Sequence, residues 1–381
     1  MDPYKNIFSK CLIIDFGSGT TKAGLSHEDN PRVVLETVVG RPVMTRVIPS
    51  NKNQVVIGSK GHSASLYKYE KPVRRGIIQN YESLKLILNN ILDELRIKSL
   101  TDTPILITEA TGVPINQRKK ITELIFENYD AACLYFGNQA VFDLHSIGKT
   151  SGCVLDIGYG LSQVGCVYNG YKLDHSFERS DVAGCDIDEH LSALMRKSEL
   201  FINPQTEFGL LKSIKEAKCR LLDYEQLELL KSAELGKIIE PSTPIILPDG
   251  EEVRLSNERF LAPEILFKPE MIGLTAKGVH TLVAESIERT NIELRNKLYK
   301  NIYLTGGTTN LDNFANRLTS ELKTIVPNDA GLSIASSTGR KDFQAWHGAS
   351  MLSLSNDLSN VWIKKTDYKE MGETVLVRKG F

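Results

Sequence analysis

The chain has 381 residues, of which 41% are hydrophobic and 24% are charged. This composition excludes a disordered chain and a coiled coil, and the length favours two domains. The 46 Lys and Arg residues nearly cancel the 47 Asp and Glu residues. The overall charge therefore gives no support to a nucleic-acid-binding function, although it does not exclude a local basic patch.

The cysteines are scattered and include no C-x-x-C pair, which predicts buried thiols in a reducing compartment rather than disulfides or a zinc site. The first ten residues, MDPYKNIFSK, contain no apolar signal core. No stretch approaches the length of a membrane span, so we expect an intracellular, soluble protein without membrane insertion. The six cysteines are Cys11, Cys133, Cys153, Cys166, Cys185 and Cys219.

The first half of the chain alternates strands and helices. Residues 11–16 form an apolar run that ends in Asp and Gly, which predicts a strand entering a tight turn. Residues 43–71 are short, polar and basic, and predict a peripheral lobe. The spacing at 83–95 predicts a helix whose N-cap is its first serine. A buried strand is expected at 105–110, and an amphipathic helix at 117–128.

The second half continues the same alternation. We expect a helix over 138–148, ending at Gly148, and then a strand at 153–157. Residues 199–260 predict a second lobe with a strand pair around the turn LPDG at 247–250. A strand at 301–307 runs into glycines, and a helix follows at 311–325. These elements predict an α/β fold.

One hairpin sequence occurs twice. LIIDFGSGTTKAGL and CVLDIGYGLSQVGCV share an apolar strand, an Asp, two glycines spaced by one residue, and a second amphipathic strand. Internal repeats indicate architecture more reliably than single motifs. This repeat predicts two homologous α/β domains that face each other across a cleft.

The glycine-rich turns of both hairpins suit a polyphosphate. Glycines allow close backbone approach and supply N–H donors, while Mg²⁺ takes one or two carboxylates together with phosphate oxygens and waters. Asp15 and Asp156 each end a strand beside the glycines and are the candidate metal ligands, and Lys22 would add a positive charge. The candidate phosphate donors are Gly17, Ser18, Gly19 and Thr20 in the first turn, and Gly158, Tyr159, Gly160 and Leu161 in the second.

The alternative is two ordinary hairpins with turn glycines. The matching apolar contexts and a further glycine pair, Gly306–Gly307, argue against it. The chain contains no Walker A loop, and neither hairpin opens directly into a helix as a Rossmann fingerprint does. Gln139, near the start of a predicted helix, would orient a water toward a γ-phosphate, or would simply be a capping or surface residue.

Long collinear stretches resemble actin and the actin-related proteins, within the wider superfamily of actin, chaperone and sugar-kinase ATPases. The resemblance covers nearly the whole chain, from about Leu12 to Phe381. The stretches that carry it include VVGRP at 38–42, LITEATGVPINQRKK at 106–120, NQAVFDL at 138–144, DVAGCDID at 181–188, IKEAKC at 214–219, LPDGEEVRLSNERFLAPEILFKPEMIG at 247–273, LTGGTTNL at 304–311, RKDFQAWHGASML at 340–352 and WIKKTDYKEMG at 362–372.

The resemblance implies an actin-like ATPase fold with four subdomains around a nucleotide cleft. Subdomain 1 would hold 1–34, 72–146 and 340–381; subdomain 2, with a docking loop, 35–71; subdomain 3, 147–182 and 271–339; and subdomain 4, 183–270. It implies ATP or ADP with Mg²⁺ as cofactor. It also implies that Gln139 positions the water that attacks the γ-phosphate. The nucleoside pocket would be lined by Gly184, Lys215, Glu216, Gly306, Gly307, Thr308 and Lys341.

The second hairpin departs from the actin pattern D-S-G-D-G-V-T-H. Tyr159 replaces the acidic residue between the glycines, and Gln163 replaces the histidine that relays protons around the attacking water. The phosphate cradle depends on the glycines and would survive, whereas water activation by Gln139 and Asp156 would be impaired. We therefore expect nucleotide binding with slow or absent hydrolysis, a weak ATPase at most. The alternative is that Tyr159 points away from the cleft and Gln163 substitutes sterically.

The resemblance also implies a cytoplasmic, cytoskeletal protein that assembles with copies of itself or within a multi-subunit actin-related complex, in contact with actin-binding-type proteins. The length and RFLAPEILF at 259–267 favour the centractin type, which forms the filament of dynactin. Alternatives are a divergent conventional actin with dynamic filaments, or a non-polymerising scaffold of a nuclear or chromatin complex. The apolar residues suited to filament contacts are Val43, Met44, Val47, Ile48, Tyr171, Met271, Ile272 and Leu274.

Overall fold

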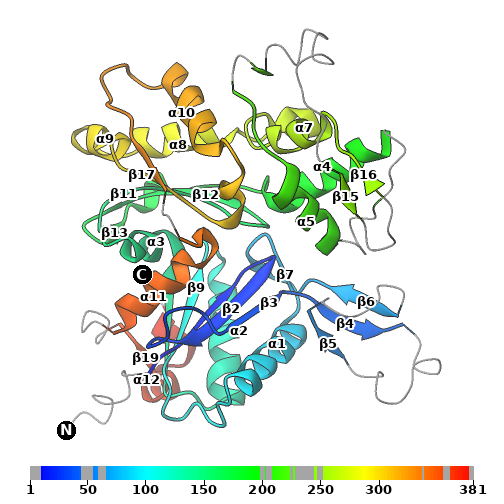
Figure 1. Cartoon of the computed structure of the whole chain (residues 1–381). Coiled ribbons are helices and arrows are strands. Elements are labelled where there is room, and N and C mark those ends of the chain that lie inside the picture. Colours follow the sequence, from blue (N-terminus) through cyan, green and yellow to red (C-terminus); the bar gives the residue numbers. More distant parts are fainter. Residues whose placement is uncertain are drawn as a thin grey trace. The chain divides into compact units, whose positions relative to one another are not determined.

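The structure, a computed structural model, forms two compact units, whose elements are labelled in Figure 1. The first comprises Met1–Val154, Val167–Lys172 and Asp342–Phe381, and the second Leu155–Cys166 and Leu173–Lys341. The four-subdomain boundaries inferred from the sequence remain a prediction. The structure describes residues 10–43, 55–58, 66–197, 202, 208–223, 226–227, 244–246, 252–336, 339–354 and 361–376.

The first unit is built on a mixed sheet with the strand order β19-β10-β9-β1-β2-β3. Strand β1 runs antiparallel to β2 and parallel to β9, so the first repeat forms the predicted hairpin beside a buried strand. The strands are β1 (Leu12–Phe16), β2 (Thr20–Leu25), β3 (Val33–Glu36), β9 (Ile105–Glu109), β10 (Cys133–Asn138) and β19 (Ile363–Lys364). A smaller sheet has the order β5-β4-β6, with β4 at Val39–Pro42, β5 at Val56–Ile57 and β6 at Tyr67–Glu70, and β7 (Val73–Arg74) pairs with β8 (Ile77–Ile78).

Both faces of the first sheet are covered, which explains why β1 is an uninterrupted apolar run. Leu12 and Ile14 point into one core and Ile13 into another, because successive side chains of a strand face opposite ways. The second of these cores contains Trp346, whose Nε1–H donates to the carbonyl of Ile13 at 3.3 Å. Strand β1 is therefore held from both sides, and its end at Asp15 is rigidly placed.

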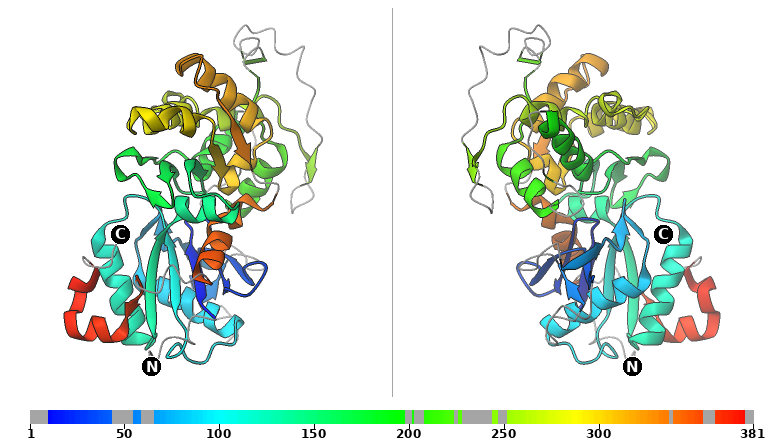
Figure 2. Two further views of the ribbon diagram at one scale, coloured as in Figure 1. Left: turned by 90° about the vertical axis from the view of Figure 1, so that its left-hand side faces the viewer. Right: turned by 90° about the vertical axis from the view of Figure 1, so that its right-hand side faces the viewer.

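Two helices approach closely on the Trp346 face. In α11 (Gln344–Ser353), a Cβ on Gly348 would lie 1.7 Å from the carbonyl oxygen of Phe142 in α3 (Gln139–Ser146). Only glycine permits this approach. Figure 2 shows α12 (Lys365–Met371) alongside the helical segment of residues 115–128, where Tyr368 stacks on Phe126 with ring centroids 5.1 Å apart.

The helix predicted at 83–95 starts earlier than its sequence suggested. Helix α1 spans Tyr81–Glu94, and its N-cap is Asn80, whose side chain accepts from the backbone N–H of Ser83 at 3.0 Å. Ser83 itself is buried and donates its hydroxyl to Glu70. The prediction of a serine cap was wrong because Asn80 also fits the cap position and lies three residues before Ser83.

The second unit contains most of a sheet with the order β13-β12-β11-β17-β18, and β14 pairs with β12. The second repeat supplies its central hairpin, β11 (Gly152–Ile157) and β12 (Ser162–Tyr168), as predicted. The other strands are β13 (Tyr171–Lys172), β14 (Glu178–Ser180), β17 (Ile302–Thr305) and β18 (Ile334–Ser336), and β15 (Ile245–Ile246) pairs with β16 (Glu252–Val253). The pair β15–β16 confirms the expected strand pair, while its turn at 247–250 lies outside the described residues.

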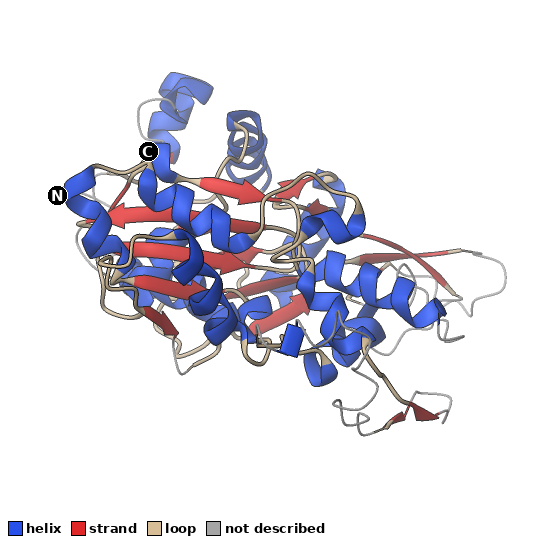
Figure 3. Ribbon diagram, turned by 90° about the horizontal axis from the view of Figure 1, so that it is seen from above, coloured by secondary structure: helices blue, strands red, loops and turns tan. Residues whose placement is uncertain are grey.

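Helices pack on the faces of both sheets (Figure 3). In the second unit, α4 packs against α5 and α7, and α8 packs against α9 and α10. Arg317 of α10 is fully buried and donates to both carboxylate oxygens of Glu264 at 2.6 and 3.0 Å, which ties α10 to α7. The helices are α4 (Gly184–Lys197), α5 (Phe208–Lys218), α7 (Glu258–Glu264), α8 (Val279–Glu288), α9 (Ile292–Tyr299) and α10 (Phe314–Ile325).

The remaining predicted elements are present with shifted ends. The helix expected at 117–128 is α2 (Ile115–Glu123), which continues as a π-helical turn over Leu124–Asn128. The helix expected at 311–325 begins at Phe314, because Asn313 takes a left-handed conformation just before it. The helix expected to end at Gly148 is α3, which ends at Ser146, and Gly148 follows with a positive φ. Among the described helices, none is long and apolar enough to cross a membrane.

Candidate functional site

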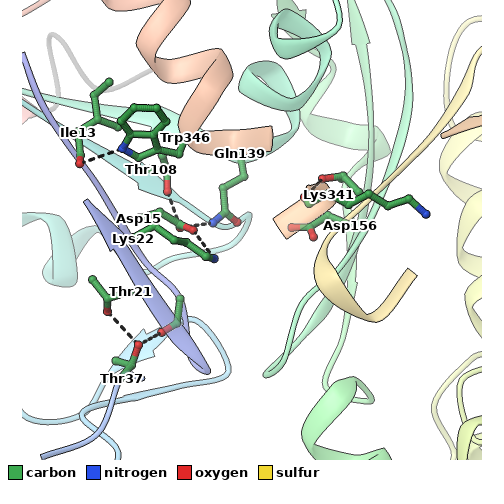
Figure 4. A network of polar contacts seen from close by, with 12 residues as sticks. Ile13, Asp15, Thr21, Lys22, Thr37, Thr108, Gln139, Asp156, Lys341 and Trp346 are labelled. Carbon is green, nitrogen blue, oxygen red and sulfur yellow. Dashed lines mark hydrogen bonds and ion pairs between the residues drawn. The ribbon is translucent and has the colours of Figure 1, made fainter. Parts of the chain in front are cut away.

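Asp15 is the centre of a polar cluster at the end of β1 in the first unit (Figure 4). Its Oδ2 pairs with the ammonium of Lys22 at 2.8 Å, and its Oδ1 accepts from Thr108 Oγ1 at 2.7 Å and from Gln139 Nε2 at 3.0 Å. The strand register explains this convergence, since Asp15 lies opposite Lys22 on β2 and beside Thr108 on β9. Asp15 is only 4% exposed, and three donors fix the orientation of its carboxylate.

Thr37, the residue that follows β3, holds the turn of the first hairpin. Thr37 donates its hydroxyl to the carbonyl of Gly17 at 2.7 Å and its backbone N–H to the carbonyl of Gly19 at 3.1 Å. Ser18 accepts from the backbone N–H of Gly76 at 2.9 Å. A Cβ on Gly17 would lie 2.6 Å from the carbonyl oxygen of Thr20, so the tight turn requires glycine there. These contacts hold the turn that is predicted to bind phosphate against its own unit.

Helix α3 places Gln139 at its first turn. Asn138 is the N-cap and accepts from the N–H of Ala140 at 3.0 Å, which starts the helix at Gln139. The Gln139 amide nitrogen donates to Asp15, and the carbonyl oxygen of the same side chain is a hydrogen-bond acceptor. The capping alternative is excluded, because Asn138 performs that role.

Asp156 holds the corresponding place in the second hairpin. Its Oδ2 accepts from Gln163 Nε2 at 2.7 Å, and Gln163 is only 3% exposed. In both hairpins the side chain seven positions after the aspartate binds that aspartate: Lys22 binds Asp15, and Gln163 binds Asp156. The repeat therefore extends to side-chain contacts, with a cation in the first copy and a neutral amide in the second.

Three loops meet behind the second hairpin. The carbonyl of Gly158 accepts from the backbone N–H of Gly184 at 3.2 Å and from the hydroxyl of Thr308 at 2.8 Å. A Cβ on Gly184 would lie 2.7 Å from that hydroxyl. The turn itself is closed by the N–H of Gly158, which donates to the carbonyl of Leu161 at 3.0 Å across Gly160. The structure thus brings these predicted donors together around Gly158.

Gly306 is the most constrained glycine of this group. Its φ is +81°, and a Cβ there would lie 2.3 Å from Asp156 Oδ1 and 2.4 Å from the carbonyl oxygen of Ile157. We expect Gly306→Ala to destabilise the protein by more than about 1 kcal/mol and to displace the Asp156 carboxylate. Chemical denaturation measures the first effect. Gly339→Ala is the control, because a Cβ there meets nothing within 4 Å; equal stabilities of the two variants would contradict the prediction.

The predicted nucleoside residues have different environments. Lys341 donates its ammonium to the carbonyl of Thr309 at 3.0 Å, its own carbonyl accepts from Gly306, and burial lowers its pKa. Lys215 is 3% exposed and bonds to the carbonyl of Gly184 at 2.8 Å. Glu216 instead lies on an exposed part of α5 and pairs with Lys212. Gly307 begins a short 3-10 turn over Gly307–Asn310.

Sequence reasoning missed three residues that complete these clusters: Thr37, Thr108 and Asp188. Thr108 ends the buried run of β9, and the parallel pairing of β9 with β1 places it beside Asp15. The buried run was visible in the sequence, but its pairing partner was not. Thr37 and Asp188 reach their partners through tertiary contacts, and no local pattern distinguishes them. Asp188 is 2% exposed and pairs with Lys215 at 2.8 Å.

The chemistry of each aspartate, taken within its own unit, suits a contact with a hydrated magnesium ion. Within the described ranges, no group of three or more His, Cys, Asp and Glu side chains could enclose a metal. Mg²⁺ does not need such a group, because it retains several waters and is commonly bound through one or two carboxylates and phosphate oxygens. Within the first unit Asp15 is a carboxylate of this kind, oriented by the amide of Gln139 beside a glycine turn. Within the second unit Asp156 has the same character and is oriented by the amide of Gln163.

A comparison with known protein families finds one family whose model includes both hairpins. A family model described as actin matches residues 8–210 and 205–381. The match includes the two Asp-x-Gly-x-Gly hairpins, the strand that carries Thr108, the helix that begins at Gln139 and the glycine pair at Gly306. With two mixed α/β sheets, each containing one copy of the hairpin, the fold is that of actin. The chain belongs to the actin family.

Proposed function

We propose that this protein binds Mg-ATP through its two hairpins and uses the nucleotide as a subunit of a cytoskeletal assembly. The observation that carries the proposal is the repeated side-chain contact, in which Asp15 and Asp156 are each held by the residue seven positions later. Turn glycines alone occur in many hairpins, but two aspartates fixed in this way beside glycine turns are typical of a site for a phosphate-bound cation.

Each group has a chemical role in this proposal. The backbone N–H groups of Gly17 to Thr20 and of Gly158 to Leu161 would bind phosphate oxygens, and Lys22 would neutralise charge on the phosphates. Asp15 and Asp156 would hold water molecules of the hydrated magnesium ion. Magnesium would supply charge neutralisation of the phosphates. Gln139 would orient a water through its carbonyl oxygen.

We propose further that hydrolysis is slow. The side chain beside Asp156 is Gln163, a neutral amide that donates to the carboxylate at 2.7 Å and has no lone-pair nitrogen to accept a proton. Gln139 is likewise an amide and not a base. Neither Gln163 nor Gln139 therefore offers the proton acceptor that the family histidine provides. Fast hydrolysis coupled to assembly would instead favour the conventional actin alternative.

Equilibrium binding tests the nucleotide proposal. After removal of any bound nucleotide, a fluorescent ATP analogue should bind saturably in the presence of Mg²⁺. Chelation of magnesium should weaken that binding by at least about tenfold, equivalent to about 1.4 kcal/mol. Absence of saturable binding in either condition would contradict the proposal.

We also propose that the protein assembles with copies of itself. The observation in favour is a set of large apolar side chains exposed at positions where filament contacts were expected: Tyr171 is 78% exposed, Leu274 42% and Met271 40%. Val43 is 58% exposed, whereas Met44, Val47 and Ile48 lie outside the described residues. The centractin-type branch of the family, proposed from the length and from residues 259–267, forms such an assembly.

Sedimentation tests the assembly. Replacing Tyr171 or Leu274 with Ser should raise the critical concentration for polymer by about tenfold or more, because burial of one large apolar side chain contributes about 1.5–3 kcal/mol. Ile292→Ser is the matched control, since Ile292 is 75% exposed and has no expected filament contact. If wild-type protein remains in the supernatant with Mg-ATP at all concentrations, the non-polymerising scaffold alternative gains support.

A further inference from the structure

Tyr159, the residue that replaces the family's acidic side chain between the two glycines, takes part in a buried polar cluster. Burial, the charge of Asp188 and a side-chain hydrogen bond to that carboxylate raise the pKa of the Tyr159 hydroxyl. The ammonium of Lys215 pairs with the same carboxylate at 2.8 Å and lies 5.4 Å from the centre of the Tyr159 ring. Lys215 also donates to the carbonyl of Gly184 at 2.8 Å. We call Tyr159, Asp188 and Lys215 the hairpin triad.

The environment of the hairpin triad makes these contacts strong. Lys215 and Asp188 are 3% and 2% exposed. Burial, followed by the charge of Asp188, raises the pKa of Tyr159, so the phenol remains a protonated donor at physiological pH. The buried ion pair of Lys215 and Asp188 is costly to separate, because each charge would lose its partner in a medium of low dielectric constant.

Backbone bonds connect the same two elements. The N–H of Cys185 donates to the carbonyl of Tyr159 at 2.7 Å, and the N–H of Gly184 donates to the carbonyl of Gly158 at 3.2 Å. These two donors belong to the first turn of α4, where backbone N–H groups have no intrahelical acceptor. The second hairpin is therefore attached to α4 by two backbone bonds, and the hairpin triad surrounds that attachment with side chains.

We propose that Tyr159 is a positioning residue, and that the hairpin triad fixes the second hairpin against α4 whether or not nucleotide is bound. The order of the phosphate loop then comes from protein contacts and does not require phosphate. An acidic residue at position 159 would place a second carboxylate beside Asp188, so Tyr159 and Asp188 suit each other in this chain. The inference rests on the proposed function only in taking this hairpin as the phosphate loop.

Amide hydrogen exchange of the nucleotide-free protein tests the proposal. In the wild type, the amides of Gly184 and Cys185 should stay protected without nucleotide. In Tyr159→Phe, which removes one hydroxyl, and in Asp188→Asn, their exchange should accelerate by about tenfold or more, as expected for loss of a buried charged hydrogen bond. Tyr303→Phe is the matched control, because its hydroxyl also bonds within the second unit, to Asn301 at 3.2 Å.

A double variant separates a coupled contact from general destabilisation. If the two side chains act through one bond, Tyr159→Phe combined with Asp188→Asn should exchange little faster than the more affected single variant. Unchanged exchange in both single variants, or purely multiplicative effects in the double, would overturn the proposal. Failure of ATP to bind would refute the proposed function, but it would not change the exchange rates of the nucleotide-free protein. Failure of the proposed function and failure of this inference are therefore distinguishable.

Discussion

Replacing Asp15 with Ala is expected to abolish magnesium-dependent nucleotide binding and to destabilise the protein by about 3–5 kcal/mol. Asp15 accepts from Lys22, Thr108 and Gln139, and all of these bonds are lost together. Lys22 is only 8% exposed, so its ammonium would lose a carboxylate partner inside the protein. Chemical denaturation and binding of a fluorescent ATP analogue measure the two effects.

A charge-neutral double variant separates these effects. Asp15→Asn combined with Lys22→Met removes both charges, and Asn retains an acceptor for Thr108 and Gln139. Its stability should return to within about 1.5 kcal/mol of the wild type, because replacing a whole buried ion pair is often close to neutral. Nucleotide binding should remain weak, since the anionic metal ligand is still missing. Restored magnesium-dependent binding in this variant would contradict the role assigned to Asp15.

Replacing Gln163 with His is expected to accelerate phosphate release by at least about tenfold, because a positioned general base contributes about 10²–10⁴. Position 163 touches the Asp156 carboxylate, and an imidazole there can accept a proton where the amide cannot. The rate of this variant should fall as the pH drops through the pKa of the histidine, ordinarily about 6.5, because imidazolium is no longer an acceptor. The wild-type rate should not show that transition.

Gln163→Asn is the control for this gain. It keeps an amide, but its shorter side chain loses the bond to Asp156 without adding a base. We expect slower phosphate release than in the wild type, or no change, and no new dependence on pH. Single-turnover assays with bound ATP measure all three proteins. Equal rates for the histidine and asparagine variants would mean that proton acceptance at position 163 does not limit hydrolysis.

The hairpins and their aspartates were predictable because the information is local. An apolar strand, an Asp and two spaced glycines determine a strand, a tight turn and a strand, and the repeat of that pattern predicted the pairing of β1 with β2 and of β11 with β12. Ion pairing between Asp15 and Lys22 also follows from the hairpin register, which places the two residues opposite each other. The helix ends were less predictable, as Asn80 and Asn313 show, because several residues compete for each cap.

The contacts of the second hairpin could not be predicted in this way. Tyr159 was expected either to impair the site or to point away from it, and its partners Asp188 and Lys215 lie on separate helices. Lys215 was assigned to the nucleoside, yet its ammonium bonds to Asp188 and to the carbonyl of Gly184. Such contacts depend on tertiary packing, and the spacing of residues along a single sequence does not reveal them.

The most direct test of the central claim is to identify the nucleotide that remains bound to the purified full-length protein. We would release it by denaturation, separate it by chromatography and follow its conversion during incubation with Mg²⁺. Our account predicts stoichiometric adenine nucleotide, mostly ATP, that persists through long incubation. Protein that carries no nucleotide and cannot be loaded with Mg-ATP would contradict it.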